Sequence, residues 1–210
     1  HRRCFYCDFA VVPLGDRADA YGGSGSGSIE AYLDLLSTEI NLSPQGPALA
    51  TVYVGGGTPS LLRPDQIAGL LQQLRGRFGF QDGAEITLEM DPATFARSDL
   101  HALIAAGITR VSLGGQSFDN VRLAALGRRH RRQDLLEACH WLQESVQVGD
   151  LQSWSLDLIR NLPEQGDLEW EAQLEQAVTV QAPHVSIYDL SVEPGTVFAW
   201  REKRGELALP

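Results

Sequence analysis

The chain has 210 residues, of which 43% are hydrophobic and 21% charged, an ordinary composition for one globular domain. Its net charge of −10 argues against a nucleic-acid partner, because such binding requires Lys and Arg side chains that replace counterions. No apolar run reaches the roughly 20 residues that span a bilayer, so we expect a protein that is not integral to a membrane.

Helical and strand patterns alternate along the chain after a Gly/Ser-rich stretch at residues 14–28, which predicts a surface loop. Strands are assigned to short apolar or β-branched runs, and helices to segments with apolar residues three and four apart. In chain order the expected elements are a helix at 29–40, a strand at 51–54, a helix at 64–77, a strand at 86–90, a helix at 95–106, a strand at 109–113, helices at 119–126 and 133–146, a strand at 154–159, a helix at 168–181 and a strand at 184–190.

This alternation, with a period of roughly 30–40 residues, favours right-handed βαβ units around a parallel sheet. The strands read as apolar runs and not as strict alternations, which predicts that both faces of the sheet are covered. We expect one further strand upstream of His1, and the pattern does not indicate a self-contained eight-unit barrel.

Polar residues follow the predicted strands at the point where each strand ends. Glu89, Gln116 and Asp157 lie at or just past such ends, as does the turn Gly55-Gly56-Gly57-Thr58. A helix cap or a polar loop residue would explain any one of them. Because ligands of parallel α/β folds bind at the carboxyl edge of the sheet, four such positions on one rim favour a common site.

Two of the three cysteines form a Cys-x-x-Cys at Cys4 and Cys7. This spacing occurs in zinc, redox and iron–sulfur sites, so alone it leaves all three open. A zinc site would need two more Cys or His ligands at suitable spacing, and the sequence does not supply them. Cys139 lies in an apolar helical pattern and is interpreted as a small core residue.

The segment from His1 to Phe9 resembles the end of the radical S-adenosylmethionine (SAM) signature, Cys-x3-Cys-x2-Cys. In that alignment the first cysteine falls immediately before His1, and the chain is expected to be a fragment that lacks it. The resemblance implies that Cys4 and Cys7 ligate a [4Fe–4S] cluster whose open iron binds SAM.

Further segments are similar to motifs of the anaerobic coproporphyrinogen oxidase and HemW branch of this family, in the same order. Asn161 departs from the usual glycine of its motif, and Asn suits a left-handed turn there. The similar segments are Tyr53–Ser60, Leu88–Pro92, Gly115–Phe118, Leu126–His130, Asp157–Pro163 and His184–Thr196.

The resemblance also implies roles for individual residues. Arg128 would pair with the SAM carboxylate, which suits a guanidinium fork. Tyr6 would contact adenine through its backbone. The methionyl amino end would lie against Gly56, Gly57 and Thr58, and the ribose or amino group would bind Glu89, Gln116 and Asp157.

The implied fold is a partial (βα)6-type barrel, with residues 1–210 as one core domain that lacks the first strand and the C-terminal region. Two activities share this scaffold: an oxygen-independent coproporphyrinogen III oxidase, and a heme chaperone that delivers heme to respiratory proteins. The oxidase pattern has a fourth cysteine where this chain has Phe9, and the chain has Ser117 where the oxidase has Asp. Both differences favour the chaperone.

The sequence leaves the activity and the heme ligands undecided, and it gives expectations for the partner and the cellular location. A non-enzymatic α/β module is the alternative outside these two activities, and whether the chain is an enzyme is undecided. Heme or a porphyrinogen is the expected small partner, and an oxidation-sensitive cluster favours the cytoplasm. The sequence assigns no heme ligand, and the candidates by chemistry alone are His1, His101, His130, His140 and His184.

Overall fold

The computed structural model describes residues 3–11 and 26–207. The expected elements all occur, and two additional short helices, η2 and α7, are present. The elements are α1 (Ser26–Leu42), β1 (Leu49–Val54), η2 (Pro59–Leu61), α2 (Pro64–Phe78), β2 (Phe80–Met90), α3 (Arg97–Ala105), β3 (Arg110–Gln116), α4 (Asn120–Ala125), α5 (Arg132–Gln147), β4 (Ser153–Arg160), α6 (Asp167–Thr179), β5 (His184–Asp189) and α7 (Val197–Lys203).

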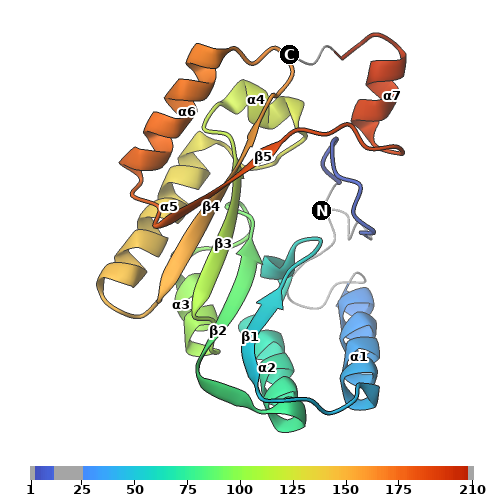
Figure 1. Ribbon diagram of the computed structural model, residues 1–210, viewed down its shortest axis with the longest axis vertical. Coiled ribbons are helices and arrows are strands. Elements are labelled where there is room, and N and C mark those ends of the chain that lie inside the picture. Colours follow the sequence, from blue (N-terminus) through green and yellow to red (C-terminus); the bar gives the residue numbers. More distant parts are fainter. Residues whose placement is uncertain (1–2, 12–25, 208–210) are drawn as a thin grey trace.

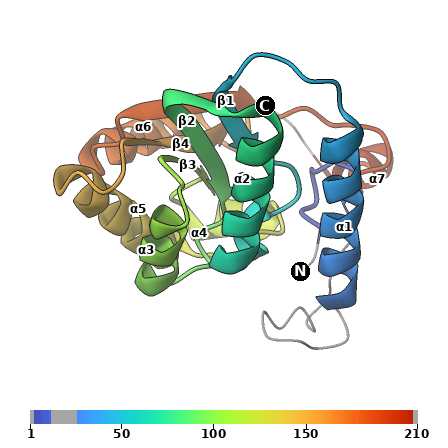
Figure 2. The same ribbon diagram turned by 90° about the horizontal axis from the view of Figure 1, so that it is seen from below.

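The five strands form one parallel sheet in the order β1-β2-β3-β4-β5, which confirms the predicted α/β architecture. The sheet is curled into part of a barrel, as the two perpendicular views show (Figures 1 and 2). Because every strand runs in the same direction, all five carboxyl ends meet at one rim of the sheet. The chain therefore brings residues from five separate segments to the same edge.

The outer face of the sheet is apolar and carries the main core. Side chains of α2, α3, α5 and α6 pack against alternate residues of the strands, and many of these residues are fully buried. The strand residues in this core include Val52, Ile86, Leu88, Val111, Leu113, Trp154 and Leu156.

The inner face is polar, so the expectation of uniformly apolar strands was wrong. Successive side chains of a strand point to opposite faces, and the residues between the core positions are Tyr53, Glu89, Ser112, Ser155 and Asp157. This face lines the inside of the curled sheet. The described helices that contribute to the main core pack on the opposite, outer face. The strands therefore alternate, with polar residues on the concave side.

Most predicted boundaries are shifted by one to three residues in the structure, and two of the differences have local reasons. The structure begins β2 at Phe80, six residues before the predicted start, because Leu49 pairs with Phe80 and Thr51 with Glu85 across an irregularity that includes Gly83 at φ +72°. The predicted Gly/Ser loop lies mostly outside the described residues, and its last three residues belong to α1.

A second, smaller core fixes the N-terminal segment, residues 3–11, which runs beside α7 (Figures 1 and 2). Its buried members are Leu126, Ile159, Leu162 and Phe198, and the partly buried Phe5 and Tyr6 pack against them. The amide of Phe5 donates to the Leu126 carbonyl at 3.0 Å, and the Phe198 amide donates to the Phe5 carbonyl at 3.0 Å. The Cys-x-x-Cys segment is thus tied to the loop after α4 and to α7.

Candidate functional site

Cys4 and Cys7 lie in a tight turn of the N-terminal segment, in which the Cys7 amide donates to the Cys4 carbonyl at 3.3 Å. Both thiols are free and half-buried. Phe5 lies under the guanidinium of Arg201, whose Cζ is 4.7 Å from the ring centroid. Between the cysteines, burial raises the pKa of the Tyr6 hydroxyl to about 12 against the opposing charge of Arg128, so this phenol stays neutral.

Arg128 connects the cysteine turn to the sheet. Its Nη1 lies 3.6 Å from the Cys4 sulfur, and its Nη2 donates to the Gly114 carbonyl at 2.6 Å. The same Nη2 is 3.2 Å from Oδ2 of Asp91. Burial acts to lower the pKa of this guanidinium, but Asp91, Tyr6 and Cys4 raise it above its usual value, so it remains charged.

Asp91 directly follows β2 and is buried together with its partners. Its Oδ1 accepts from the Ala93 amide at 3.0 Å and lies 3.7 Å from Nδ1 of His130. Burial acts to raise the pKa of this carboxyl, but Arg128, His130 and the Ala93 amide outweigh burial and lower the pKa to about 2. The carboxylate is therefore ionised at neutral pH.

Glu89 holds the glycine turn that follows β1. Its Oε2 accepts from the Gly56 amide at 2.9 Å, and its Oε1 accepts from the Tyr53 hydroxyl at 2.9 Å. Gly56 has φ +117°, which favours glycine, and a Cβ on Gly57 would lie 3.1 Å from a methyl of Val11. The turn therefore lies against the N-terminal segment that carries the cysteines.

Asp157 lies on the polar inner face of β4. Its Oδ2 accepts from the Ser112 hydroxyl at 2.9 Å, and the Ser155 hydroxyl donates to the Ser112 oxygen at 3.1 Å. Its Oδ1 is buried and forms no hydrogen bond to any residue that the structure describes. Burial raises the pKa of the Asp157 carboxyl, and the nearby Glu89 charge adds to this effect.

Two site-rim residues adopt left-handed backbone conformations. Gln116 ends β3 at φ 63°, and a Cβ on the neighbouring Gly114 would meet the Gln116 amide nitrogen and Arg128 Nη2, both at 3.1 Å. Asn161 has φ 60°, which confirms the left-handed turn expected there, and its amide donates to Asp189 at 3.1 Å.

The structure thus places the predicted site residues in two groups. Cys4, Tyr6 and Arg128 lie together at the N-terminal segment, with Gln116 beside Arg128 across Gly114. Glu89 joins the glycine turn of Gly56, Gly57 and Thr58, and the charges of Glu89 and Asp157 influence one another across the inner face. Each role implied by the family resemblance stays a prediction.

Sequence reasoning missed Asp91 and Tyr53, although each adjoins a predicted site residue. Asp91 stands one residue past the end of β2, and Glu89 and Gln116 lie within the last two residues of their strands, so the search at strand ends could have found Asp91 as well. Tyr53 lies within the glycine motif, and only its contact with Glu89 distinguishes it from a core aromatic.

The histidine candidates for heme ligation are separated by burial. His130 is fully buried, and its Nε2 donates to the Gly115 carbonyl at 3.0 Å, so this ring is not open to a ligand. His101, His140 and His184 are exposed, and His1 lies outside the described residues.

The residues present fit a cluster and SAM in their chemistry. Two thiols lie in one turn, and a charged guanidinium is directed at one of them. Three buried side-chain atoms at the site, Arg128 Nε, His130 Nδ1 and Asp157 Oδ1, form no hydrogen bond to a described residue, and buried polar atoms are normally paired. Within residues 3–11 and 26–207, no three His, Cys, Asp or Glu residues form a complete metal site by themselves.

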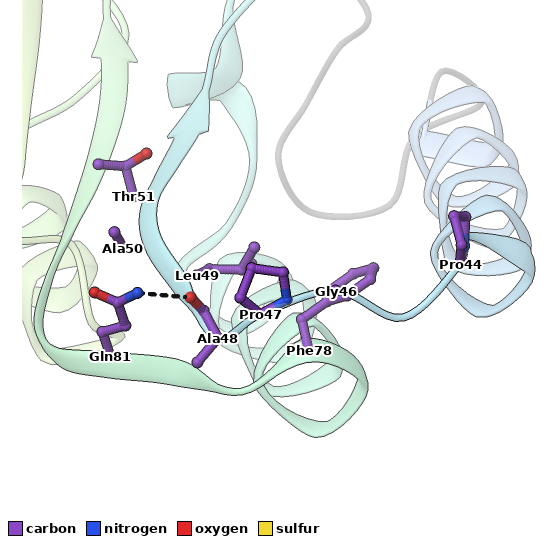
Figure 3. A pocket seen from close by; sticks show the side chains of 9 residues that line it. All are labelled: Pro44, Gly46, Pro47, Ala48, Leu49, Ala50, Thr51, Phe78 and Gln81. Atoms are coloured by element: carbon purple, nitrogen blue, oxygen red, sulfur yellow. Dashed lines mark hydrogen bonds between the residues drawn. The ribbon is translucent and has the colours of Figure 1, made fainter.

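A shallow pocket of about 420 Å³ lies elsewhere, at the amino end of β1 (Figure 3). Its lining comes from the α1–β1 connection, Phe78 and Gln81, and the Gln81 amide donates to the Ala48 carbonyl at 3.0 Å. No titratable side chain lines it. Since the polar rim lies at the opposite end of β1, this pocket is not part of the candidate site.

The fold and the site together define a class: a curled, parallel α/β sheet whose carboxyl rim faces a Cys-x-x-Cys turn, a glycine turn and a buried arginine. Residues 1–174 match the model of the radical SAM superfamily, and the chain belongs to this family. Membership implies a [4Fe–4S] cluster and SAM as cofactors.

Two relatives and one solved structure describe the similarity further. The chain is 39% identical over 210 residues to the heme chaperone HemW of Synechocystis sp., covering 100% of the chain and 49% of the relative. It is 35% identical to HemW of Haemophilus influenzae, with 95% of the chain and 51% of the relative covered. The structure of coproporphyrinogen III oxidase (HemN) from Escherichia coli, a radical SAM enzyme, matches with a TM-score of 0.81 and 27% identity, covering 100% of the chain and 46% of that structure.

The chain therefore spans about half the length of the curated relatives it matches. Among the residues that the structure describes, no helix is both long and apolar enough to cross a membrane.

Proposed function

We propose that this chain is the radical SAM core of a HemW-like heme chaperone. The observation that carries the proposal is Phe9, which stands where the oxidase signature has a fourth cysteine. Phe9 lies two residues beyond Cys7 and is 57% exposed. This position therefore presents a phenyl ring to the surroundings of the cysteine turn in place of a thiol. The identity with two HemW proteins supports the same assignment.

In this proposal Cys4 and Cys7 are two of three thiolate ligands of a [4Fe–4S] cluster. When bound, the cluster supplies an open iron for SAM and an electron for its reductive cleavage. The charged Arg128 would bind the SAM carboxylate with the donors that its chain partners leave free. The glycine turn, which Glu89 holds through the Gly56 amide, would let the methionyl group approach the backbone.

The inner face supplies the remaining contacts. The buried Oδ1 of Asp157 has no hydrogen-bond partner among residues 3–11 and 26–207 and would accept from a ribose hydroxyl, to which Gln116 would also bind. Tyr6, neutral and partly buried, would cover the adenine through its backbone. We also propose that residues 1–210 form a single core unit. In the cell, heme would be the cargo and heme-accepting respiratory proteins the partners, and a reducing cytoplasm would protect the cluster.

The second candidate is oxygen-independent coproporphyrinogen III oxidase. The structural match to HemN over the whole chain favours it. That enzyme and the chaperone would share the cluster and SAM site, so the two functions differ in what happens to the porphyrin. Heme binding without porphyrinogen turnover selects the chaperone.

The test uses the chain with one cysteine added directly before His1, which completes the three-cysteine pattern. After anaerobic reconstitution with iron and sulfide, EPR of the reduced protein is recorded with and without SAM, and heme is titrated in parallel. We expect a [4Fe–4S] signal that shifts on adding SAM, stoichiometric heme binding, and no turnover of coproporphyrinogen.

Two cysteine variants provide the control. Cys4→Ser removes a proposed ligand and should abolish the cluster, whereas Cys139→Ala removes a thiol buried in the core and should preserve it. Absence of a cluster in the parent chain would leave the non-enzymatic α/β module as the better interpretation. Turnover of coproporphyrinogen would select the oxidase.

A further inference from the structure

Asp91, Arg128 and His130 form a buried group of charged and polar side chains behind the cysteine turn, which we call the Asp91 cluster. Asp91 comes from the end of β2, and the other two come from the loop between α4 and α5. The Asp91 and Arg128 side chains are each 11% exposed, and His130 is fully buried. Asp91 belongs to the Leu88–Pro92 motif, in which the family resemblance implies a role for Glu89 alone.

The carboxylate of Asp91 is itself held in a fixed orientation. The Ala93 amide donates to Oδ1 at 3.0 Å, and Arg128 Nη2 lies 3.2 Å from Oδ2. His130 Nδ1 packs 3.7 Å from Oδ1 without a hydrogen bond. The His130 ring is anchored from its other side, because Nε2 donates to the Gly115 carbonyl at 3.0 Å. The cluster is therefore braced against β3 as well as β2.

This fixed carboxylate determines how the Arg128 guanidinium lies. Asp91 Oδ2 at 3.2 Å and the Gly114 carbonyl at 2.6 Å share one nitrogen, Nη2. The other terminal nitrogen, Nη1, is left to point at the Cys4 sulfur, and Nε has no partner. The chain thus fixes one arm of the fork, while Nη1 donates to the Cys4 sulfur and Nε stays unpartnered among the described residues, so both face the space beside Cys4.

An arginine side chain without such partners samples several rotamers, and it loses this conformational entropy when it binds a ligand. A fork that is already oriented loses less, which increases its affinity for a carboxylate. A buried guanidinium also requires a compensating charge, and Asp91 provides it without occupying Nη1.

We infer that Asp91 is a positioning residue that orients Arg128 toward the cysteine turn and so prepares it to receive the carboxylate of SAM. This inference rests on the proposed function, because it assumes that SAM binds beside Cys4. It adds a residue and a mechanism to the proposed site: Asp91 acts through Arg128 and does not touch the ligand.

The first measurement uses the chain itself, without cofactors. Hydrogen exchange of the Phe5 and Cys7 amides, which bond to Leu126 and Cys4, reports how firmly the cysteine turn is held. Asp91→Asn should accelerate exchange of these amides several-fold relative to α5. Asp65→Asn is the matched control, because it breaks an exposed Arg63–Asp65 pair that is not part of the Asp91 cluster and should leave both segments unchanged.

The second measurement uses the cluster-loaded chain that carries the added cysteine. We expect Asp91→Asn to weaken SAM binding about tenfold or more, the size of a lost charge-assisted hydrogen bond, and to reduce the SAM-induced EPR shift. Arg128→Gln should weaken binding at least as much. In the Arg128→Gln background, Asp91→Asn should have no further effect, since Asp91 acts only through Arg128.

The outcomes separate this inference from the proposed function. If the parent chain binds no SAM, the proposed function fails. If the parent binds SAM and Asp91→Asn binds it equally well or more tightly, only the positioning role is overturned. An equal loss from Asp91→Asn in both backgrounds would also overturn it, because Asp91 would then act independently of Arg128.

Discussion

Gly127 links the end of α4 to the cysteine turn, and its replacement by alanine tests how the turn is held. Its amide donates to the Ala124 carbonyl, and the Arg128 amide donates to the Leu123 carbonyl, which together form a Schellman motif. Gly127 has φ +77°, and an added Cβ would lie 3.1–3.2 Å from three atoms of the Phe5 ring. The substitution therefore combines backbone strain with a steric contact.

The two effects can be given separate magnitudes. A left-handed alanine costs about 1–2 kcal/mol, and the more restricted unfolded chain offsets up to about 1 kcal/mol of this. Phe5 cannot easily move away, because its amide and carbonyl are bonded to Leu126 and Phe198. Overpacking of this kind costs about 1–3 kcal/mol more. We expect Gly127→Ala to destabilise the fold by about 2–4 kcal/mol in total.

Gly149 provides a matched control. It ends α5 in the same motif, with its amide bonded to Val146 and the Asp150 amide bonded to Ser145. Its φ is +83°, but nothing lies within 4 Å of an added Cβ. Gly149→Ala should therefore show the backbone cost alone, about 1 kcal/mol.

The assay is urea unfolding followed by circular dichroism, with the free energy of unfolding compared among the parent and the two variants. The difference between the variants isolates the contact with Phe5. If the two free energies agree within about 0.5 kcal/mol, Gly127 does not restrain Phe5 and the tie between α4 and the cysteine turn is refuted.

Three further predictions concern carboxylates and their partners. Tyr53→Phe removes the hydroxyl that donates to Glu89 and should lower the free energy of unfolding by about 0.5–1.5 kcal/mol, measured in urea. The pKa of Asp91 is lowered from 3.8 to about 2 in the folded chain, so this carboxyl stabilises the fold by about 2 kcal/mol above pH 4. That contribution should disappear as the pH falls from about 4 to 2, and Asp91→Asn should remove this part of the pH dependence in thermal melts. The pKa of Asp157 is raised by burial, so its ionised form opposes folding at neutral pH. Asp157→Asn should therefore raise the melting temperature at pH 7, and the gain should vanish at a pH below the carboxyl's unfolded value of 3.8; a gain that persists there would contradict this cause.

Much of the fold was predictable because its signals are local. Apolar spacing identified the main helices and strands, and their alternation gave the parallel sheet. The short α7 was missed, although Thr196 caps it by accepting from the Ala199 amide, because seven residues provide too few turns for a periodic pattern. The face polarity of the strands was misread, since a curled sheet leaves its inner face without a helix layer.

The site was predictable where residue types mark strand ends or family motifs. Glu89, Gln116 and Asp157 were identified in this way. The structure places Glu89 and Gln116 at the ends of β2 and β3, whereas Asp157 lies within β4, three residues before its end. Their partners were not predictable. Both carboxylate oxygens of Glu89 accept hydrogen bonds, one from the Tyr53 hydroxyl and one from the Gly56 amide. These partners are more than 30 residues away in sequence, so only the fold brings them to Glu89.

The sequence by itself determined the order of the elements and the edge of the sheet at which chemistry is possible, because periodicity and chain direction are properties of neighbouring residues. Only the tertiary structure decided which polar groups meet. Arg128 reaches Cys4 across 124 residues of chain, and it does so because the second core ties the N-terminal segment to α7 and the loop after α4. Such contacts depend on how distant segments pack, and no local pattern encodes them.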